Sequence, residues 1–79
     1  MSFSGHKRRA QREDLPLSHR ASSARSCAVL VSEKFGIHRS ELIAIVKVET
    51  GIDMHNMSDS SSINQSVEFL DWYRFNRKE

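Results

Sequence analysis

AVLVSEKFGIHRSELIAIVK, residues 28–47, is the stretch from which the fold of this chain can be worked out. Its apolar side chains recur every three or four positions on both sides of Gly36, which is the spacing of one helix face. Glycine readily adopts the left-handed conformation that ends helices, so Gly36 marks the end of a first helix. The stretch therefore predicts a helix, a tight turn and a second helix.

The helical spacing continues on both sides of this stretch. Pro16 cannot lie inside a helix and Ser18 is a favourable N-cap, so the first helix is expected over residues 19–35. The second helix is expected over residues 39–49, because Gly51 supplies a second stop signal. Upstream of the turn, the apolar positions that step by three or four residues are Leu17, Ala21, Ala24, Ala28, Val31 and Phe35.

A third helix is expected towards the end of the chain. Residues 53–62 are polar and contain three consecutive serines, which is typical of a loop. Ser62 and Gln65 fit a capping box, and an apolar stripe at helical spacing follows them. The third helix is therefore predicted over residues 63–76, and its aromatic side chains are Phe69, Trp72, Tyr73 and Phe75.

The first 14 residues, MSFSGHKRRAQRED, show no hydrophobic periodicity and are rich in positive charge. We expect a disordered basic arm over residues 1–14 and a single helical domain over residues 15–79. Residues 1–39 contain eight Lys and Arg against three Asp and Glu, whereas residues 40–79 contain four against seven. This asymmetry favours an arm that binds a polyanion. Its cations are Lys7, Arg8, Arg9 and Arg12.

Length and composition limit the possible functions. A chain of 79 residues forms at most one domain with a small core, so the expected fold is an all-α domain of three helices. Cys27 is the only cysteine and is predicted to be a buried small hydrophobe. No metal-ligand spacing, phosphate loop or nucleophile motif is present, so we expect no metal, cofactor, small-molecule substrate or enzymatic activity. No apolar run could span a membrane and no secretory signal is visible, which predicts a cytoplasmic protein.

The central stretch resembles the helix-turn-helix of phage and bacterial repressors over residues 28–47. That unit has a small residue where its helices touch, a glycine at the turn and an apolar residue after it. Ser32, Gly36 and Ile37 occupy these positions, although the family usually has alanine where this chain has Ser32. The inward-facing residues that the resemblance implies are Val31, Phe35, Leu42 and Ile45.

The resemblance implies that the second helix enters a groove of DNA or RNA and that the protein is a non-enzymatic transcriptional regulator. Arg39 and Ser40 would reach base edges, and Lys47 would lie along the phosphates. The outward positions would be His38, Arg39, Ser40, Glu41, Ile43, Ala44 and Lys47. The predicted nucleic-acid contacts are Lys7, Arg8, Arg9, Arg12, Arg25, His38, Arg39, Ser40 and Lys47. A homodimer is expected, with Phe69, Trp72, Tyr73 and Phe75 as its interface.

Two alternatives remain open. The second helix is apolar nearly all round, which suits a small adaptor or inhibitor that binds another protein through its second and third helices. ELIAIVKVETGIDM followed by SVEFLDWY is also similar to the last part of acyl carrier proteins. That family would place its prosthetic group on Ser40, but the aspartate that should precede this serine is Arg39 here. The carrier alternative is therefore disfavoured.

Overall fold

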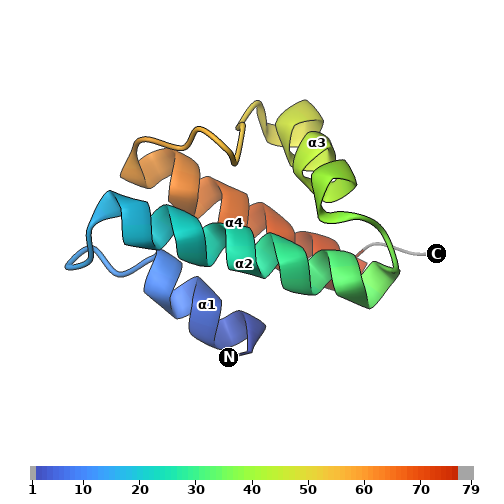
Figure 1. Ribbon diagram of the computed structural model, residues 1–79, viewed down its shortest axis with the longest axis horizontal. Coiled ribbons are helices and arrows are strands. Elements are labelled where there is room, and N and C mark those ends of the chain that lie inside the picture. Colours follow the sequence, from blue (N-terminus) through green and yellow to red (C-terminus); the bar gives the residue numbers. More distant parts are fainter. Residues whose placement is uncertain (1, 77–79) are drawn as a thin grey trace.

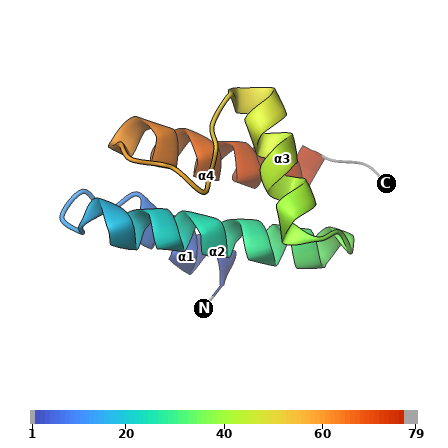
Figure 2. The ribbon, with the colours of Figure 1, turned by 45° about the horizontal axis from the view of Figure 1, so that its top comes forward.

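The computed structural model describes residues 2–76 and folds them into four α-helices without a β-strand. α1 is Phe3–Ala10, α2 is Leu17–Phe35, α3 is Arg39–Thr50 and α4 is Ser60–Asn76. α2 and α4 lie side by side and run in the same direction, while α1 lies along α2 and α3 crosses its C-terminal end steeply (Figures 1 and 2). The prediction of an all-α fold is confirmed, and the predicted number of three helices is wrong.

The additional helix is α1, which forms within the segment that was predicted to be a disordered arm. The Ser2 side chain caps α1 by accepting a hydrogen bond from the Gly5 N–H at 3.2 Å. Phe3 and Ala10 are seven positions apart, so they share one face of the helix, and both are buried. Two apolar residues over two turns give too weak a period for detection in the sequence, which explains the error.

α2 begins slightly earlier than predicted. Its first residue is Leu17 and its N-cap is Pro16, whose backbone lies at φ −58° and ψ 147°. Proline has a fixed φ and lacks an N–H, so it fits a helix start, where N–H groups have no partner within the helix. Ser18 was predicted as the N-cap, but it lies exposed in the first turn.

The two glycine stops are confirmed. Gly36 has φ 68° and Gly51 has φ 78°, so both adopt the left-handed conformation that glycine tolerates best. After Gly36 the chain turns back, and the Ile37 N–H donates to the Ser32 carbonyl at 3.0 Å. This bond satisfies one of the carbonyl groups that the end of α2 would otherwise leave without a partner.

α4 begins at Ser60, three residues before the predicted start. Its cap is Asp59 rather than Ser62, because the Asp59 carboxylate accepts a hydrogen bond from the Ser62 N–H at 2.7 Å. The pKa of Asp59 is lowered by the hydrogen bonds that Ser62 donates. The predicted capping box with Gln65 does not form, and Gln65 donates to the Ser61 hydroxyl instead.

The hydrophobic core lies between α2 and α4 and is closed by α1, α3 and the loop before α4. Alanines line the buried side of α2, which allows neighbouring helices to approach closely. Cys27 is fully buried, as predicted. The largest side chains with almost no exposure are Val31, Leu42, Val46, Met54, Ile63, Val67 and Leu70. No helix in the described part of the chain is both long and apolar enough to cross a membrane.

Arg20 is the charged side chain within this core and is only 3 % exposed. Its Nε donates to the Ala10 carbonyl at 2.7 Å, at the C-terminal end of α1. Its Nη2 donates to the Ser60 hydroxyl at 2.8 Å and to the Asn64 side-chain carbonyl at 3.2 Å. Arg20 therefore joins the end of α1 to the start of α4, a role that the sequence did not reveal.

Candidate nucleic-acid interface

α2 and α3 form the unit that the sequence predicted around Gly36. Ser32 is 3 % exposed, as expected of a small residue at a close helix contact, and Leu42 is fully buried. Ile45 is only half-buried. Ile43 was predicted to face outward, but it is 7 % exposed and belongs to the core with Leu42 and Val46. The burial of three large apolar side chains stabilises this orientation of α3.

The exposed charges of α3 fall on two flanks. Arg39 and Lys47 lie on one flank, which we call the basic flank, and Glu41 and Glu49 lie on the other, the acidic flank. The two members of each pair are offset by roughly 80° around the helix axis, and the middle of the basic pair lies roughly 200° from the middle of the acidic pair. All four side chains are exposed. The electrostatic character of α3 therefore changes sign across the helix.

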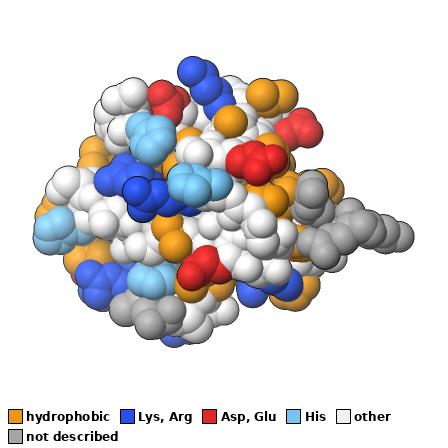
Figure 3. Space-filling view, turned by 45° about the vertical axis from the view of Figure 1, so that its right-hand side comes forward, with side chains coloured by type: hydrophobic (Ala, Val, Ile, Leu, Met, Phe, Trp, Pro, Cys, Tyr) orange, Lys and Arg blue, Asp and Glu red, His pale blue; other side chains and the backbone are white. Residues whose placement is uncertain are grey.

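A shallow pocket borders the basic flank. Arg25 of α2, Arg39 of α3 and His55 of the following loop line a hollow of about 240 Å³, together with Val29 and Ile43. The Arg25 Nη1 donates to the Met54 carbonyl at 3.1 Å, which fixes this guanidinium against the loop. Figure 3 shows a face of the molecule on which Lys and Arg side chains lie beside His side chains. We call Arg25, Arg39, Lys47 and His55 the α3 cationic surface.

Two predicted contact residues are engaged with each other at the start of α3. The His38 Nδ1 accepts a hydrogen bond from the Ser40 N–H at 3.1 Å and lies 2.7 Å from the Ser40 hydroxyl. His38 therefore caps α3, and this contact requires Nδ1 to be unprotonated. Both residues are exposed, so a ligand can reach them although they already share a local contact.

A second group of cations lies on α1. Arg8, Arg9 and Arg12 line an open hollow of about 610 Å³ together with Gly5, and we call these three arginines the α1 cationic surface. Arg12 also forms an ion pair with Asp14, in which Nη2 lies 2.6 Å from Oδ2. The Arg8 and Arg9 side chains are exposed, and no ion pair involves them within residues 2–76.

Lys7 differs from its neighbours because it points to α4. Its Nζ lies 2.7 Å from the Glu68 carboxylate and 2.8 Å from the Asp71 carboxylate. The hydrogen bonds that Lys7 donates to these two carboxylates raise its pKa. Arg74 also donates to Asp71 at 2.8 Å, and its guanidinium lies 4.1 Å from the ring centroid of Phe3. Lys7 was predicted to contact nucleic acid, and the structure places it in a network that holds α1 against α4.

The two cationic surfaces are separate. α1 and α3 each contact α2 and α4, but within the described residues they make no contact with each other. They lie on different sides of α2 (Figures 1 and 2). The structure therefore does not bring the predicted nucleic-acid residues together into a single surface.

The aromatic residues of α4 divide between surface and core. Trp72 is 57 % exposed and Phe75 is 71 % exposed, so both are available to a partner. Phe69 is half-buried, and its ring lies against Trp72 and Tyr73. Tyr73 was predicted at the interface, but it is 5 % exposed and meets the Phe35 ring edge to face at 5.5 Å. Its place in the α2–α4 core corrects that part of the interface prediction.

His55 is the residue of the α3 cationic surface that sequence reasoning did not find. It lies in an irregular loop, and no periodic pattern in the sequence places this loop beside Arg25 and Arg39. In residues 2–76 no group of three His, Cys, Asp or Glu side chains is arranged to hold a metal ion. Comparisons with protein families, with curated proteins and with solved structures find no match to this chain.

Proposed function

We propose that this protein is a small non-enzymatic nucleic-acid-binding protein of the helix-turn-helix type, acting as a transcriptional regulator. The observation that carries the proposal is the convergence of Arg25, Arg39 and His55, from three different segments, around one hollow beside α3. Guanidinium groups bind phosphate oxygens through paired, charge-assisted hydrogen bonds. A phosphate in this hollow would lie next to the helix that the sequence predicts as the recognition helix.

The two flanks of α3 define how the helix would meet a duplex. The basic flank with Arg39 and Lys47 turns towards the phosphates, and the acidic flank turns away because carboxylates repel phosphate. Ser40 then faces the groove, and it is exposed. Its short side chain offers few groups that discriminate base edges, so phosphate contacts dominate the affinity and make it strongly dependent on salt.

The proposal is tested by the fluorescence anisotropy of a labelled random-sequence duplex, titrated at two salt concentrations. The test variant is Arg39→Glu with Lys47→Glu. The matched control is Arg8→Glu with Arg9→Glu, which makes the same change in net charge on the α1 cationic surface. We expect the α3 variant to bind at least tenfold more weakly. The slope of log affinity against log salt concentration should fall by the equivalent of about two phosphate contacts.

The outcomes distinguish nucleic-acid binding through α3 from non-specific electrostatic attraction to the whole protein. A smaller effect of the α1 variant supports the proposal, because net charge alone would weaken binding equally in both proteins. Equal losses, or a loss confined to the α1 variant, would show that the α2–α3 unit does not direct binding. The absence of any binding at low salt would overturn the proposed function.

A further inference from the structure

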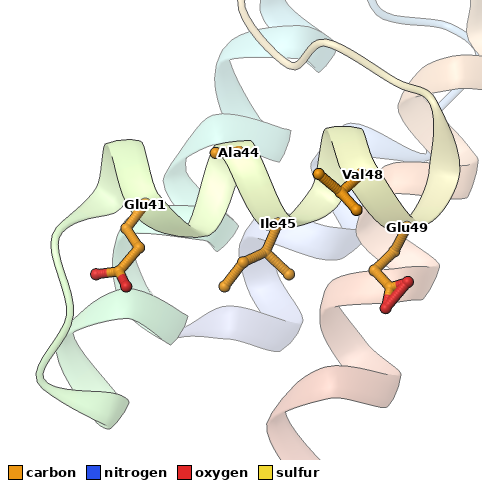
Figure 4. Close-up of a pocket in the computed structure, with 5 residues that line it drawn as sticks. All are labelled: Glu41, Ala44, Ile45, Val48 and Glu49. Carbon is orange, nitrogen blue, oxygen red and sulfur yellow. The ribbon is translucent and has the colours of Figure 1, made fainter.

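An apolar pocket lies on the acidic flank of α3, away from the cationic surface. Its volume is about 330 Å³, and its lining residues are Glu41, Ala44, Ile45, Val48 and Glu49. The side chains of Glu41, Ile45 and Glu49 point to the same side of the helix (Figure 4). Val48 is 84 % exposed, so a branched apolar side chain stands almost entirely in water. A carboxylate flanks this apolar stripe at each end.

We propose that this pocket docks an amphipathic helix of a partner protein, in which Lys or Arg residues flank the apolar anchors. The lining positions recur at the spacing of one helix face, which is how helices recognise one another in groove-type complexes. From Glu41 to Glu49 the stripe is roughly 12 Å long, which matches about two turns of a partner helix. Glu41 and Glu49 accept charge-assisted hydrogen bonds from cations at the two ends of that segment.

The α3 and α1 helices of a second copy of this chain fit the pocket poorly. Two such stripes paired in antiparallel fashion would bring Glu41 of one copy against Glu49 of the other, and like charges at that distance repel. The α1 helix of a second copy carries arginines, but its apolar residues Phe3 and Ala10 are buried. It therefore has no exposed apolar side chain to cover Val48. Charge complementarity favours a partner helix that is both basic and apolar on one face.

Nucleic acid is excluded from the same pocket because phosphates would meet two carboxylates. The pocket therefore defines a second binding surface, and this inference does not depend on the proposed function. Ile45 and Val48 are the apolar residues of the acidic flank of α3. Arg39 and Lys47 form the flank that is proposed to bind nucleic acid. One helix would present two surfaces of opposite charge to two kinds of partner.

The test uses two fluorescent peptides of a designed helical sequence, with the same leucines at every third or fourth position. One carries lysines beside the leucines and the other carries glutamates at the same positions. We expect the full chain to bind the lysine peptide at least tenfold more tightly. Glu41→Lys with Glu49→Lys is expected to reverse this preference. Equal affinity for the two peptides, or an unchanged preference in the charge-swapped protein, would overturn the proposal.

A second pair of variants tests the apolar part without altering charge. Val48→Ser is expected to lower the affinity for the lysine peptide at least fivefold. Trp72→Ser removes an exposed aromatic residue of α4 and is expected to leave this affinity unchanged. Both side chains are exposed, so circular dichroism should show unaltered folding. A greater loss of affinity in the Trp72→Ser protein would place the docking surface on α4. A dimer in sedimentation equilibrium that Val48→Ser dissociates would identify a second copy as the occupant. Either result would contradict the inference.

Discussion

Lys7 of α1 and Asp71 of α4 form an ion pair of 2.8 Å although 64 positions separate them in the sequence. Asp71 also accepts a hydrogen bond from Arg74 at 2.8 Å, so one carboxylate holds two cations. The side chains of Lys7 and Asp71 are 22 % and 29 % exposed, which limits screening by water. The pair shows how a strongly basic N-terminal segment becomes an integral part of the fold.

Lys7→Met is expected to lower the free energy of unfolding by about 1 kcal/mol, because it removes the partly buried charge but keeps most of the apolar stem. If α1 is released, trypsin should cleave the backbone after Arg8 and Arg9 more readily. Urea denaturation and limited proteolysis measure the two effects. Arg12→Met is the control, since it breaks an ion pair of 2.6 Å with Asp14 in which both side chains are more than half exposed. An equal decrease in the free energy of unfolding in the two variants would contradict a special role for Lys7.

The same network predicts how stability changes with acidity. Hydrogen bonds from Lys7 and Arg74 hold the pKa of Asp71 below its ordinary value of 3.8. A lowered pKa means that this stabilisation is fully present above pH 4 or so, and is lost as the pH falls through the lowered value. Asp71→Asn should therefore narrow the difference between urea midpoints at pH 6 and at roughly pH 3. An unchanged pH dependence would show that Asp71 does not contribute to acid sensitivity.

Arg20→Met should be among the most damaging single changes outside the apolar core, at about 2–4 kcal/mol. It would leave the Ala10 carbonyl, the Ser60 hydroxyl and the Asn64 carbonyl without their buried donor. Arg25→Met is the matched control, because Arg25 makes a single backbone contact and is only half-buried. Urea denaturation of the two variants checks the prediction. A larger loss for Arg25→Met would contradict it.

Cys27 should be chemically inert in the folded protein. Burial raises the pKa of its thiol to about 12, and the side chain has no exposed surface. Because the thiolate is the reactive form, a disulfide reagent at neutral pH should react only through unfolding. The labelling rate should then rise with urea in parallel with the unfolded fraction. Rapid, stoichiometric labelling of the native chain would contradict this placement of Cys27.

The parts of the fold that could be predicted are those with a long apolar period and a glycine stop. α2, the turn at Gly36 and α3 satisfied both conditions. α1 did not, because its stability comes from long-range contacts of Lys7 and of buried Phe3 rather than from a local pattern. The start of α4 was misplaced because Asp59 competed with Ser62 as the cap. Local chemistry could not decide between these two residues.

All residues of the α3 cationic surface except His55 were predicted individually, but their arrangement was not. Arg25 and Arg39 were predicted as nucleic-acid contacts, whereas their proximity to His55 depends on the path of an irregular loop. The outward placement of Ile43 followed from the resemblance. Packing turned this side chain inward, because its burial stabilises the fold more than its exposure. Tertiary contacts therefore determine both the position of the cations and the orientation of α3.

The attachment of α3 at one end of α2 makes it the helix most easily released. It is held through Leu42, Ile43 and Val46, while α1, α2 and α4 are further joined by Arg20 and Lys7. Hydrogen–deuterium exchange should therefore reveal a hierarchy of local openings. Amide protons of α3 should exchange through local unfolding of this helix, which costs little free energy and leaves the other helices folded. The helix that carries both proposed binding surfaces would then be the segment that a bound partner protects most.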